Sequence, residues 1–474
     1  MITLPLPRTV RRALAKPRSS AQCAFPSHST HRSNNQVPEL YKPSGSVEDY
    51  SLSEPIGIHP VFSSRITHIA KVPHFYTHLF LTYTQGGIFG EGSSIDVQRA
   101  LLTSVYEGME RYLATLYDPQ TLLYGSYRDL RPEAVDVKEL VLMCEWEYEN
   151  ANYPYVKYGD ELKLHWLRCY EIRDGDLVPR LIPATLAILR YSWTNPSERF
   201  TATLSPGTAS GPTYAAAVLH GLYELIERDA FVITWLNKLS CPKIKVKTFT
   251  SQGLTNSYRR LREDGFQVDF INITTELKIP VVLTIITQGK TKLSRTNYMA
   301  FGLGSNLNLL KALERSYAEA LELMVNYYDF NDPRKINLRN RKIKIPGFDL
   351  ERYFDQCSFL AASKEETDLA NLVTAAPKDC FSELTESLLR LSKRGLKTYF
   401  ADLTPSELKK CSQYRLVRVF ASYLQPHLYE WDCWRLDNHR IYSAPVEMGL
   451  RKRPLDNNKI NLLQNPFAVL EQLT

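Results

Sequence analysis

A motif that recurs three times constrains the fold of this chain more than any other feature of its 474 residues. Each copy begins with a short glycine-containing run, at residues 89–93, 205–211 and 301–305. Each run is followed by two glutamates spaced three residues apart, namely Glu107 and Glu110, Glu224 and Glu227, and Glu319 and Glu322. All offsets are the same in the first and third copies, and the middle copy keeps the spacing of the glutamates. Internal repetition describes architecture, so we expect three copies of one structural unit.

The residues around the motif predict the form of that unit. Each copy follows a run of β-type residues, at residues 80–84, 200–204 and 298–301, and precedes a stretch with helical apolar spacing. We therefore expect a strand, a glycine turn and a helix in each copy. Glycines in such a turn permit positive φ and the close approach of a ligand, and the start of the helix suits phosphate.

The glutamate pairs indicate what these units do. Residues three apart share a helix face, so the two carboxylates of each pair project in one direction. A single such pair is usually part of a solvated surface. Here the glutamates lie among apolar neighbours, and carboxylates are rarely buried unless they are paired or bound to a metal. Because oxygen ligands suit Mg²⁺ held together with substrate phosphates, we expect the pairs to form a metal and nucleotide site.

Two of the copies resemble the diagnostic motifs of the YcaO-like family. The middle copy, Ser205-Pro-Gly-Thr-Ala-Ser-Gly211 followed by Gly221-Leu-Tyr-Glu-Leu-Ile-Glu-Arg-Asp-Ala-Phe231, resembles the family signature. The first copy resembles the second motif, with SxxExxER running from Ser104 to Arg111. The similarity continues through shorter segments and covers most of residues 60–470. It is greatest to the stand-alone cyclodehydratase branch of thiazole/oxazole-modified peptide pathways.

That resemblance implies a fold and an activity. The fold would be α+β and YcaO-like, with three strand–glycine turn–helix units converging on one nucleotide and metal site. The activity would be that of an ATP- and Mg²⁺-dependent enzyme that phosphorylates a backbone amide oxygen of a ribosomal precursor peptide. A Cys, Ser or Thr side chain of the peptide would then close an azoline ring. Thioamide formation uses the same activation, and the sequence leaves it open.

The same resemblance implies roles for individual residues. The metal ligands would be the four glutamates of the first two copies, Glu107, Glu110, Glu224 and Glu227. Three of them, Glu107, Glu224 and Glu227, would be catalytic. The nucleotide would be bound by Ser104, Glu110, Arg111, Ser205, Gly207, Gly211, Arg228 and Glu319.

Several positions depart from the family pattern. Glu91 stands where a lysine is usual, Tyr214 to Ala216 lack the usual glutamate, and Glu322 and Met324 replace a glutamine and an arginine. The C-terminus, from Asn465, lacks the usual proline-rich tail. The lost lysine and arginine would each remove a phosphate partner. A second hypothesis is therefore a non-catalytic scaffold that docks peptide and partner enzymes.

Charge and composition predict the domain organisation. Residues 1–45 form a basic segment that we expect to be a disordered tail, with six Lys or Arg and no acid before Glu39. Removing these six from the net charge of +7 leaves +1, so the remainder gives no electrostatic case for nucleic acid. We expect residues 46–330 to form an ATP-binding core and residues 331–474 to form the C-terminal part of the same domain.

The remaining expectations concern location and partners. The eight cysteines form no CxxC pair or zinc spacing, which favours a reduced, cytoplasmic protein. No apolar run of about 18 residues predicts a membrane span. The resemblance implies an E1-like or similar partner that binds the leader of the peptide, and a flavin dehydrogenase where azolines are oxidised. It leaves a homodimer open.

Overall fold

The computed structural model describes most of the chain beyond its first 47 residues. The described residues are 48–52, 60–69, 72–81, 88–93, 97–149, 153, 155–201, 203–288, 298–331, 357–372, 377, 379–426, 434–456 and 459–462. The predicted basic tail, the proposed boundary near residue 331 and the C-terminus from Asn465 lie outside these ranges.

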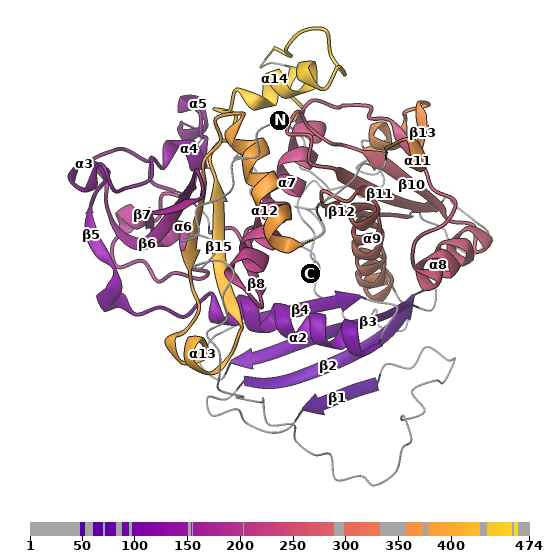
Figure 1. The fold of residues 1–474 in the computed structure, drawn as a ribbon, viewed down its shortest axis with the longest axis horizontal. Helices are drawn as coiled ribbons and strands as arrows, with labels where there is room; N and C mark the ends of the chain where they lie inside the picture. The colour runs from indigo at the N-terminus through magenta and orange to yellow at the C-terminus, as the bar shows by residue number, and fades with distance from the viewer. Residues whose placement is uncertain are drawn as a thin grey trace.

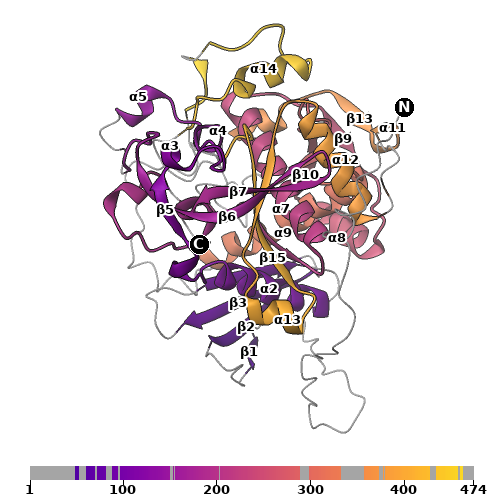
Figure 2. The same ribbon diagram turned by 60° about the vertical axis from the view of Figure 1, so that its left-hand side comes forward.

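Three sheets form the framework (Figures 1 and 2). The first is antiparallel, in the order β1 (Glu48–Leu52), β2 (Pro60–Ile69), β3 (Val72–Leu81), β4 (Ile88–Ser93). The second runs β12 (Tyr298–Ser305), β11 (Val281–Gln288), β10 (Gln267–Asn272), β9 (Lys243–Lys245), β13 (Glu366–Asp368), and only the β9–β13 pair is parallel. The third is antiparallel, in the order β5 (Leu123–Ser126), β6 (Lys163–Arg173), β14 (Thr398–Asp402), β15 (Arg415–Ala421), β8 (Thr208–Gly211). A further strand of this sheet, β7 (Asp176–Pro183), pairs with β6.

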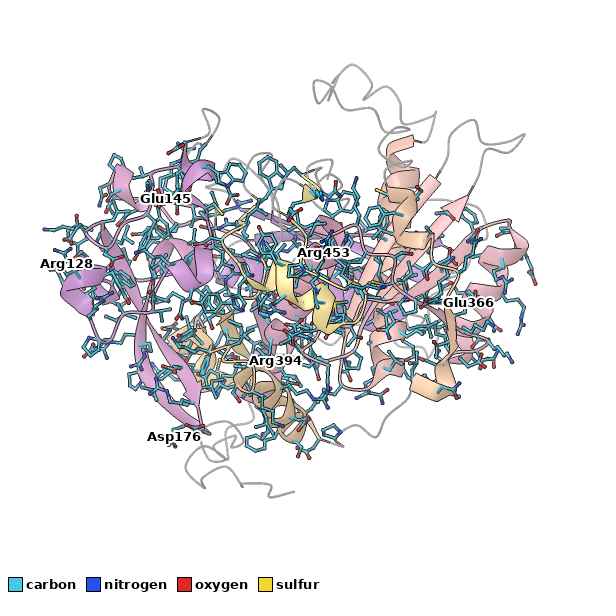
Figure 3. The ribbon with its side chains drawn as sticks, turned by 90° about the horizontal axis from the view of Figure 1, so that it is seen from above. Arg128, Glu145, Asp176, Glu366, Arg394 and Arg453 are labelled. Atoms are coloured by element: carbon cyan, nitrogen blue, oxygen red, sulfur yellow. The ribbon has the colours of Figure 1, made fainter. Side chains whose placement is uncertain are left out.

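Helices pack on and between these sheets. The longer ones are α2 (Val97–Leu113), α7 (Tyr214–Leu236), α8 (Gln252–Glu263), α9 (Leu309–Asn331), α12 (Cys380–Ser392) and α14 (Arg440–Glu447). The short ones are α3 (Tyr127–Leu130), α4 (Lys138–Val141), α5 (Glu145–Tyr148), α6 (Ala184–Ala187), α11 (Leu369–Leu372) and α13 (Ser406–Cys411). Seen from above, Arg128 of α3 and Glu366 of β13 lie at opposite ends of the molecule (Figure 3).

Each repeat of the sequence motif is a strand followed by a long helix that packs against it. The three units are β4–α2, β8–α7 and β12–α9. Each helix also contacts the strand of the next unit: α2 contacts β8, α7 contacts β12, and α9 contacts β4. The units therefore close into a ring, which confirms the α+β class and the three-unit architecture.

The expected glycine turn is wrong for the first and third units. Gly90, Gly92, Gly302 and Gly304 lie inside strands β4 and β12. A Cβ at Gly90 would lie 2.1 Å from the Ser104 carbonyl oxygen, and one at Gly302 would lie 2.1 Å from that of Ser316. These glycines therefore let the helix backbone approach the strand.

The middle unit differs from the other two. The described residues of the range 200–204 are not in a strand, and the strand of the unit is β8. Gly207 precedes β8 and has a φ of +92°, which strains any side-chain-bearing residue. The close approach is reversed here, because a Cβ at Gly221 of α7 would lie 2.8 Å from the Gly207 carbonyl oxygen.

Helix α7 forms the centre of the largest apolar core. Thr213 caps its N-terminus by accepting a hydrogen bond from the backbone N–H of Ala216. The C-terminal part is tied to α7 by a buried ion pair in which the Arg440 guanidinium donates to both carboxylate oxygens of Asp229, at 2.6 and 2.8 Å. Asp229, inside the family signature, is thus a structural residue.

The described part of the chain contains no helix long and apolar enough to cross a membrane. The six cysteines that the structure describes are free thiols: Cys144, Cys169, Cys241, Cys357, Cys380 and Cys411.

Candidate functional site

The first glutamate of every unit makes the same hydrogen bond. Its carboxylate accepts a backbone N–H from the strand, or the turn before the strand, of its own unit. The donor–acceptor distances are 2.7 Å from Glu91 N to Glu107, 2.9 Å from Gly207 N to Glu224, and 2.6 Å from Leu303 N to Glu319. This bond fixes each carboxylate at one end of its unit and leaves its second oxygen for other partners.

The second glutamate of a unit reaches the strand of the next unit. Glu227 of α7 accepts the backbone N–H of Ser305, in β12, at 2.6 Å. Glu110 of α2 accepts a hydrogen bond from the side chain of Ser210, in β8. The paired glutamates therefore link neighbouring units, which brings carboxylates from the first two repeats to one place.

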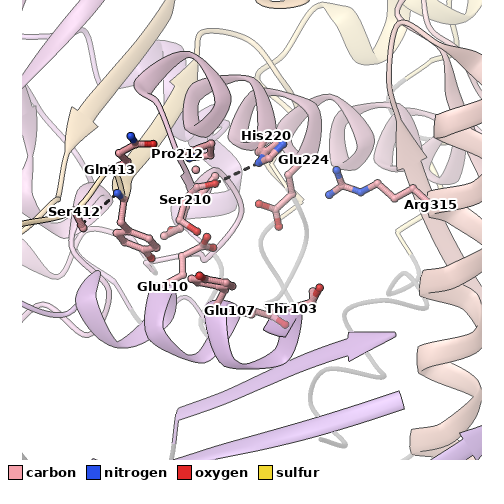
Figure 4. A pocket seen from close by; sticks show the side chains of 15 residues that line it. Thr103, Glu107, Glu110, Ser210, Pro212, His220, Glu224, Arg315, Ser412 and Gln413 are labelled. Atoms are coloured by element: carbon pink, nitrogen blue, oxygen red, sulfur yellow. Dashed lines mark hydrogen bonds between the residues drawn. The ribbon is translucent and has the colours of Figure 1, made fainter. Parts of the chain in front are cut away.

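A cavity of about 760 Å³ opens where α2, β8, α7 and α9 meet (Figure 4). Glu107 and Glu110 enter it from α2, Glu224 from α7, and Arg315 from the side of α9. The complete lining is Thr103, Tyr106, Glu107, Glu110, Thr208, Ala209, Ser210, Gly211, Pro212, His220, Glu224, Arg315, Ser412, Gln413 and Tyr414.

The neighbouring carboxylates raise the pKa of Glu110. The pKa of Glu110 is raised from 4.5 to about 8, mainly by desolvation and also by the nearby charges of Glu107 and Glu224, while the Ser210 hydrogen bond and Arg111 act to lower it. Repulsion of this kind is relieved by a cation. The three carboxylates therefore fit a divalent metal ion.

Arg315 is a site residue that the sequence reasoning missed. Its Nε lies 3.5 Å from Glu227 Oε1, and its side chain is about half exposed to the cavity and solvent (47%). Burial, opposed in part by the charge of Arg315, raises the pKa of Glu227 to about 7. The signal was present, since Arg315 precedes Ser316 of the third copy, but an arginine on a helix usually belongs to a solvated face.

The predicted site residues fall into two groups. Glu107, Glu110, Gly211 and Glu224 line the cavity, and Glu227 lies behind Arg315. The other predicted residues are absent from the lining: Ser104, Arg111, Ser205, Gly207, Arg228 and Glu319.

Their contacts explain these positions. Ser104 is buried and donates to the Leu101 carbonyl at 2.8 Å, where its backbone packs on β4. Arg111 pairs with Glu107 at 2.7 Å, one turn along α2. Arg228 reaches instead into the third unit, 3.5 Å from Glu319. The structure thus gives Ser104 a packing role and gives both arginines glutamate partners.

Two further features of the lining lie outside the predicted set of site residues. His220 of α7 lies 3.3 Å from the Ser210 carbonyl oxygen, and burial together with Arg315 lowers the pKa of His220. Residues 412–414 come from the C-terminal part, where the Tyr414 ring stacks on Tyr106 with centroids 6.4 Å apart. His220 stands in the middle repeat where Ser104 and Ser316 stand in the other two, so the repeat pattern locates it without indicating a role. Residues 412–414 lie outside the repeats, so the pattern could not reveal them.

The described residues include no group of three or more His, Cys, Asp or Glu side chains already placed around one point to hold a metal ion. Mg²⁺ at nucleotide sites usually takes one or two carboxylates and completes its shell with phosphate and water. Glu107, Glu110 and Glu224 all line the cavity, so any one or two of them could supply these carboxylates. The donor set therefore fits Mg²⁺ bound together with a nucleotide.

Comparisons with known proteins identify the family. The family model "YcaO cyclodehydratase, ATP- and Mg²⁺-binding" matches residues 91–422. An uncharacterized protein in the tfuA 3′ region of Rhizobium leguminosarum bv. trifolii is 27% identical over 240 residues, which cover 49% of this chain and 54% of that protein. An uncharacterized protein of Methanothermobacter thermautotrophicus is 20% identical over 321 residues, covering 66% of this chain and 76% of that protein.

Solved structures share the fold. A heterocyclase in complex with substrate and cofactor has a TM-score of 0.70 and 18% identity, and the match covers 89% of this chain and 55% of that one. YcaO from Methanopyrus kandleri, bound with AMPPCP and Mg²⁺, has a TM-score of 0.56 and 17% identity over 76% of this chain and 85% of its own. The E. coli microcin synthetase McbBCD complex with pro-MccB17 bound has a TM-score of 0.52 and 15% identity, over 78% and 89%.

The chain spans only about half the length of the Rhizobium protein and of the heterocyclase, 54% and 55% respectively. The family match nevertheless includes the glutamate pairs of all three repeats and the residues around the cavity. The family is ATP- and Mg²⁺-binding. The chain belongs to the YcaO family.

Proposed function

We propose that this chain is an ATP- and Mg²⁺-dependent enzyme that activates backbone amides of a ribosomal precursor peptide and closes azoline rings at Cys, Ser or Thr. The observation that carries the proposal is the cavity itself, where carboxylates of two repeats face an arginine of the third. Phosphoryl transfer depends mainly on positioning and on neutralising charge, and carboxylates with Mg²⁺ and an arginine supply these.

The proposal assigns parts to the charged residues of the site and to the start of α7. Glu107, Glu110 and Glu224 would hold Mg²⁺, and Arg315 would contact phosphate oxygens. Glu227 would act as a positioning residue, because it pairs with Arg315 and accepts the Ser305 N–H. Gly211 and Pro212 bring the start of α7 to the cavity edge, and a helix N-terminus favours phosphate.

Bound ATP would supply the phosphoryl group that turns an amide oxygen into a leaving group. The chain's own residues would hold the reactants in place. The stacked rings of Tyr106 and Tyr414 give the cavity a flat wall against which a planar group can pack. The volume of about 760 Å³ leaves room for a peptide segment beside a nucleotide.

The remaining site residues of the sequence prediction take indirect parts in this proposal. Ser104, Ser205 and Gly207 would shape the repeats around the nucleotide. Arg111 would support Glu107, and the Arg228–Glu319 pair would join the second and third units.

We also propose that the chain works with a leader-binding partner protein. The heterocyclase neighbour is nearly twice as long as the matched region, and the microcin synthetase is a complex with its peptide bound. A partner that tethers the leader would raise the effective concentration of the core peptide to about millimolar.

The test is peptide-dependent phosphate release with purified partner, peptide, ATP and Mg²⁺, together with mass spectrometry of the peptide. We expect phosphate release and the loss of one water per ring. Nucleotide binding without turnover or peptide modification would support the scaffold hypothesis instead. A peptide that exchanges oxygen for sulfur in the presence of a sulfur donor would identify thioamide formation.

A further inference from the structure

One position of the repeat is buried in two units and open in the third. Ser104 of α2 and Ser316 of α9 are fully buried, and each donates to the carbonyl three residues before it, at 2.8 and 2.9 Å. His220 holds the same position in α7, but its side chain is exposed and lines the cavity of about 760 Å³. The middle unit therefore places a histidine in the cavity where the other two units place a packed serine.

The packing of the middle unit accounts for this difference. In the first unit the strand meets the helix at the serine position, because a Cβ at Gly90 would lie 2.1 Å from the Ser104 carbonyl oxygen, and the third unit has the same contact. In the middle unit the close approach is at Gly221, one residue beyond His220. Adjacent residues of a helix point about 100° apart, so the His220 side chain is not held beneath the strand.

The hydrogen bond of His220 indicates which ring nitrogen carries the proton. Nδ1 lies 3.3 Å from the Ser210 carbonyl oxygen, which can only accept, so Nδ1 is the donor (Figure 4). Desolvation inside the cavity, together with the charge of Arg315, lowers the pKa of His220 from 6.5, so the ring is neutral near pH 7. A neutral imidazole that is protonated at Nδ1 has a lone pair at Nε2. His220 therefore offers the cavity a proton acceptor.

The neighbours of His220 are the groups assigned to phosphoryl transfer. Glu224 lies four residues along the same face of α7, and Arg315 enters the cavity from the third unit (Figure 4). A peptide amide activated by these groups would bring its carbon, and the side chain that attacks this carbon, to the same part of the cavity. Among the described residues of the lining, His220 is the only histidine. The lining carboxylates are assigned to Mg²⁺, which makes them weaker bases.

We propose that His220 is the catalytic base of ring closure and that it extends the reaction from the thiol of Cys to the hydroxyls of Ser and Thr. This inference rests on the proposed function. As the peptide side chain attacks the activated amide carbon, its S–H or O–H bond breaks, and Nε2 takes the proton while the new C–S or C–O bond forms. The C–O bond to the phosphate breaks with its electron pair, and the amide nitrogen loses its proton to solvent to give C=N. The imidazolium then returns its proton to the released phosphate.

The two kinds of nucleophile need this base to different degrees. A free thiol has a pKa of about 8.5, so roughly a few per cent is thiolate at pH 7 and attacks without a base. A hydroxyl ionises far less, and a positioned base typically contributes about 100- to 10,000-fold to such a step. Loss of the His220 imidazole should therefore slow ring closure at Ser and Thr much more than at Cys.

The first experiment compares two versions of the precursor peptide, with Cys or Ser at the ring position, in the reconstituted system with partner, ATP and Mg²⁺. His220→Asn keeps an N–H donor for the Ser210 carbonyl but has no basic nitrogen. We expect ring formation in this variant to fall about 100-fold or more at Ser and less than about tenfold at Cys. The affinity for AMPPCP with Mg²⁺ should stay within about twofold of wild type, because no phosphate contact is assigned to His220.

The matched control is His439→Asn. His439 is also an exposed histidine, at the start of α14, but it does not line the cavity. We expect both peptides to be modified by this variant at rates near those of wild type.

The second experiment does not require the reaction. Nitrogen-15 NMR of the ligand-free wild-type chain, labelled at histidine, should show the His220 ring as the neutral tautomer protonated at Nδ1 at pH 7. The signal that is missing from His220→Asn identifies the residue. A ring protonated at Nε2, or at both nitrogens, would overturn the proposal whatever the peptide assay shows.

The outcomes of the peptide assay separate this inference from the proposed function. Equal falls at Cys and Ser in His220→Asn, or a loss of AMPPCP affinity, would overturn the inference, because His220 would then support the fold or the nucleotide. A wild-type chain that closes rings at Cys but not at Ser would overturn the inference and leave the proposed function standing. A wild-type chain that modifies neither peptide would overturn both.

Discussion

Two cavities lie against neighbouring faces of α7, and they carry opposite charge. The larger, of about 760 Å³, is acidic. The smaller, of about 90 Å³, is basic because three arginines line it: Arg228, Arg418 and Arg435. Glu224 faces the larger cavity with Glu107 and Glu110, while Leu225 and Arg228 face the smaller one. Adjacent residues of a helix point about 100° apart, so one turn of α7 serves both. The middle repeat therefore contributes to both cavities: Glu224 faces the acidic one and Arg228 faces the basic one.

The surroundings of the two cavities explain this division. The acidic cavity draws its carboxylates from two repeats, and their charge is relieved by Arg315 from the third and by Arg111, which pairs with Glu107. The basic cavity draws Arg418 and Arg435 from the C-terminal part, beyond all repeats. A cation and phosphates would suit the first, whereas the arginines of the second already bind carbonyl, hydroxyl and carboxylate groups of the protein.

The largest expected effect tests the acidic side of this comparison. Glu224→Gln keeps the acceptor for Gly207 N–H but removes one negative charge from the cavity. Losing a metal ligand weakens the stabilisation of transition-state charge by several kcal/mol, so we expect peptide-dependent phosphate release to fall by a factor of about 100 or more. The measurement is a steady-state phosphate assay with partner and peptide.

Glu386→Gln is the matched control for that variant. Glu386 is likewise a helical glutamate, paired with Arg390 four residues along α12, but it lines neither cavity. We expect its activity to stay near that of wild type. Equal activities in Glu224→Gln and Glu386→Gln would show that the acidic cavity is not the site of chemistry.

A smaller effect is expected from the arginine that balances the acidic cavity. Arg315→Met removes the partner of Glu227 and the positive charge that faces Glu224. Hydrogen bonds to charged groups contribute about 1.5–3 kcal/mol, so the affinity for a nucleotide analogue with Mg²⁺ should fall roughly ten- to hundredfold. Calorimetry with AMPPCP and Mg²⁺ measures it, and an unchanged affinity would place the phosphates elsewhere.

The sequence reveals much of the acidic cavity and almost none of the basic one, for physical reasons. Paired glutamates at a repeated spacing stand out because carboxylates among apolar residues are rare. Arg418 is brought to the middle repeat by strand pairing, opposite Thr208 in the β15–β8 register, and no local pattern records that contact. Arg315 was missed because a single helical arginine carries no signal without its partner.

The glycines illustrate a different limit. Their positions in the motif are informative, but the same residues serve turns, ligand approach and close packing. Only the structure shows that Gly90 and Gly302 are strand positions facing a helix backbone. The pattern could therefore locate the repeated unit without specifying why it contains glycine.

The smallest expected effect is the release of a proton from Glu110 when ligand binds in the acidic cavity. The pKa of Glu110 is raised from 4.5 to about 8, so the folded chain without ligand takes up a proton on this carboxyl between these pH values. Its contribution to stability is present at low pH and is lost as pH rises towards 8. A bound cation favours the ionised form, so binding of Mg²⁺ with a nucleotide near pH 7 should release that proton.

Calorimetry of AMPPCP and Mg²⁺ binding at pH 7, in buffers of different ionisation enthalpy, measures this release. We expect wild type to release about one proton more than Glu110→Gln on binding, because the variant has no carboxyl to titrate at that position. Affinity for the metal–nucleotide pair should rise by up to about tenfold per pH unit below pH 8 in wild type, because each proton displaced costs about 1.4 kcal/mol per unit. Equal proton release from both chains would show that Glu110 is already ionised before the ligand binds. The carboxylates of the acidic cavity would then not raise the pKa of Glu110 as proposed.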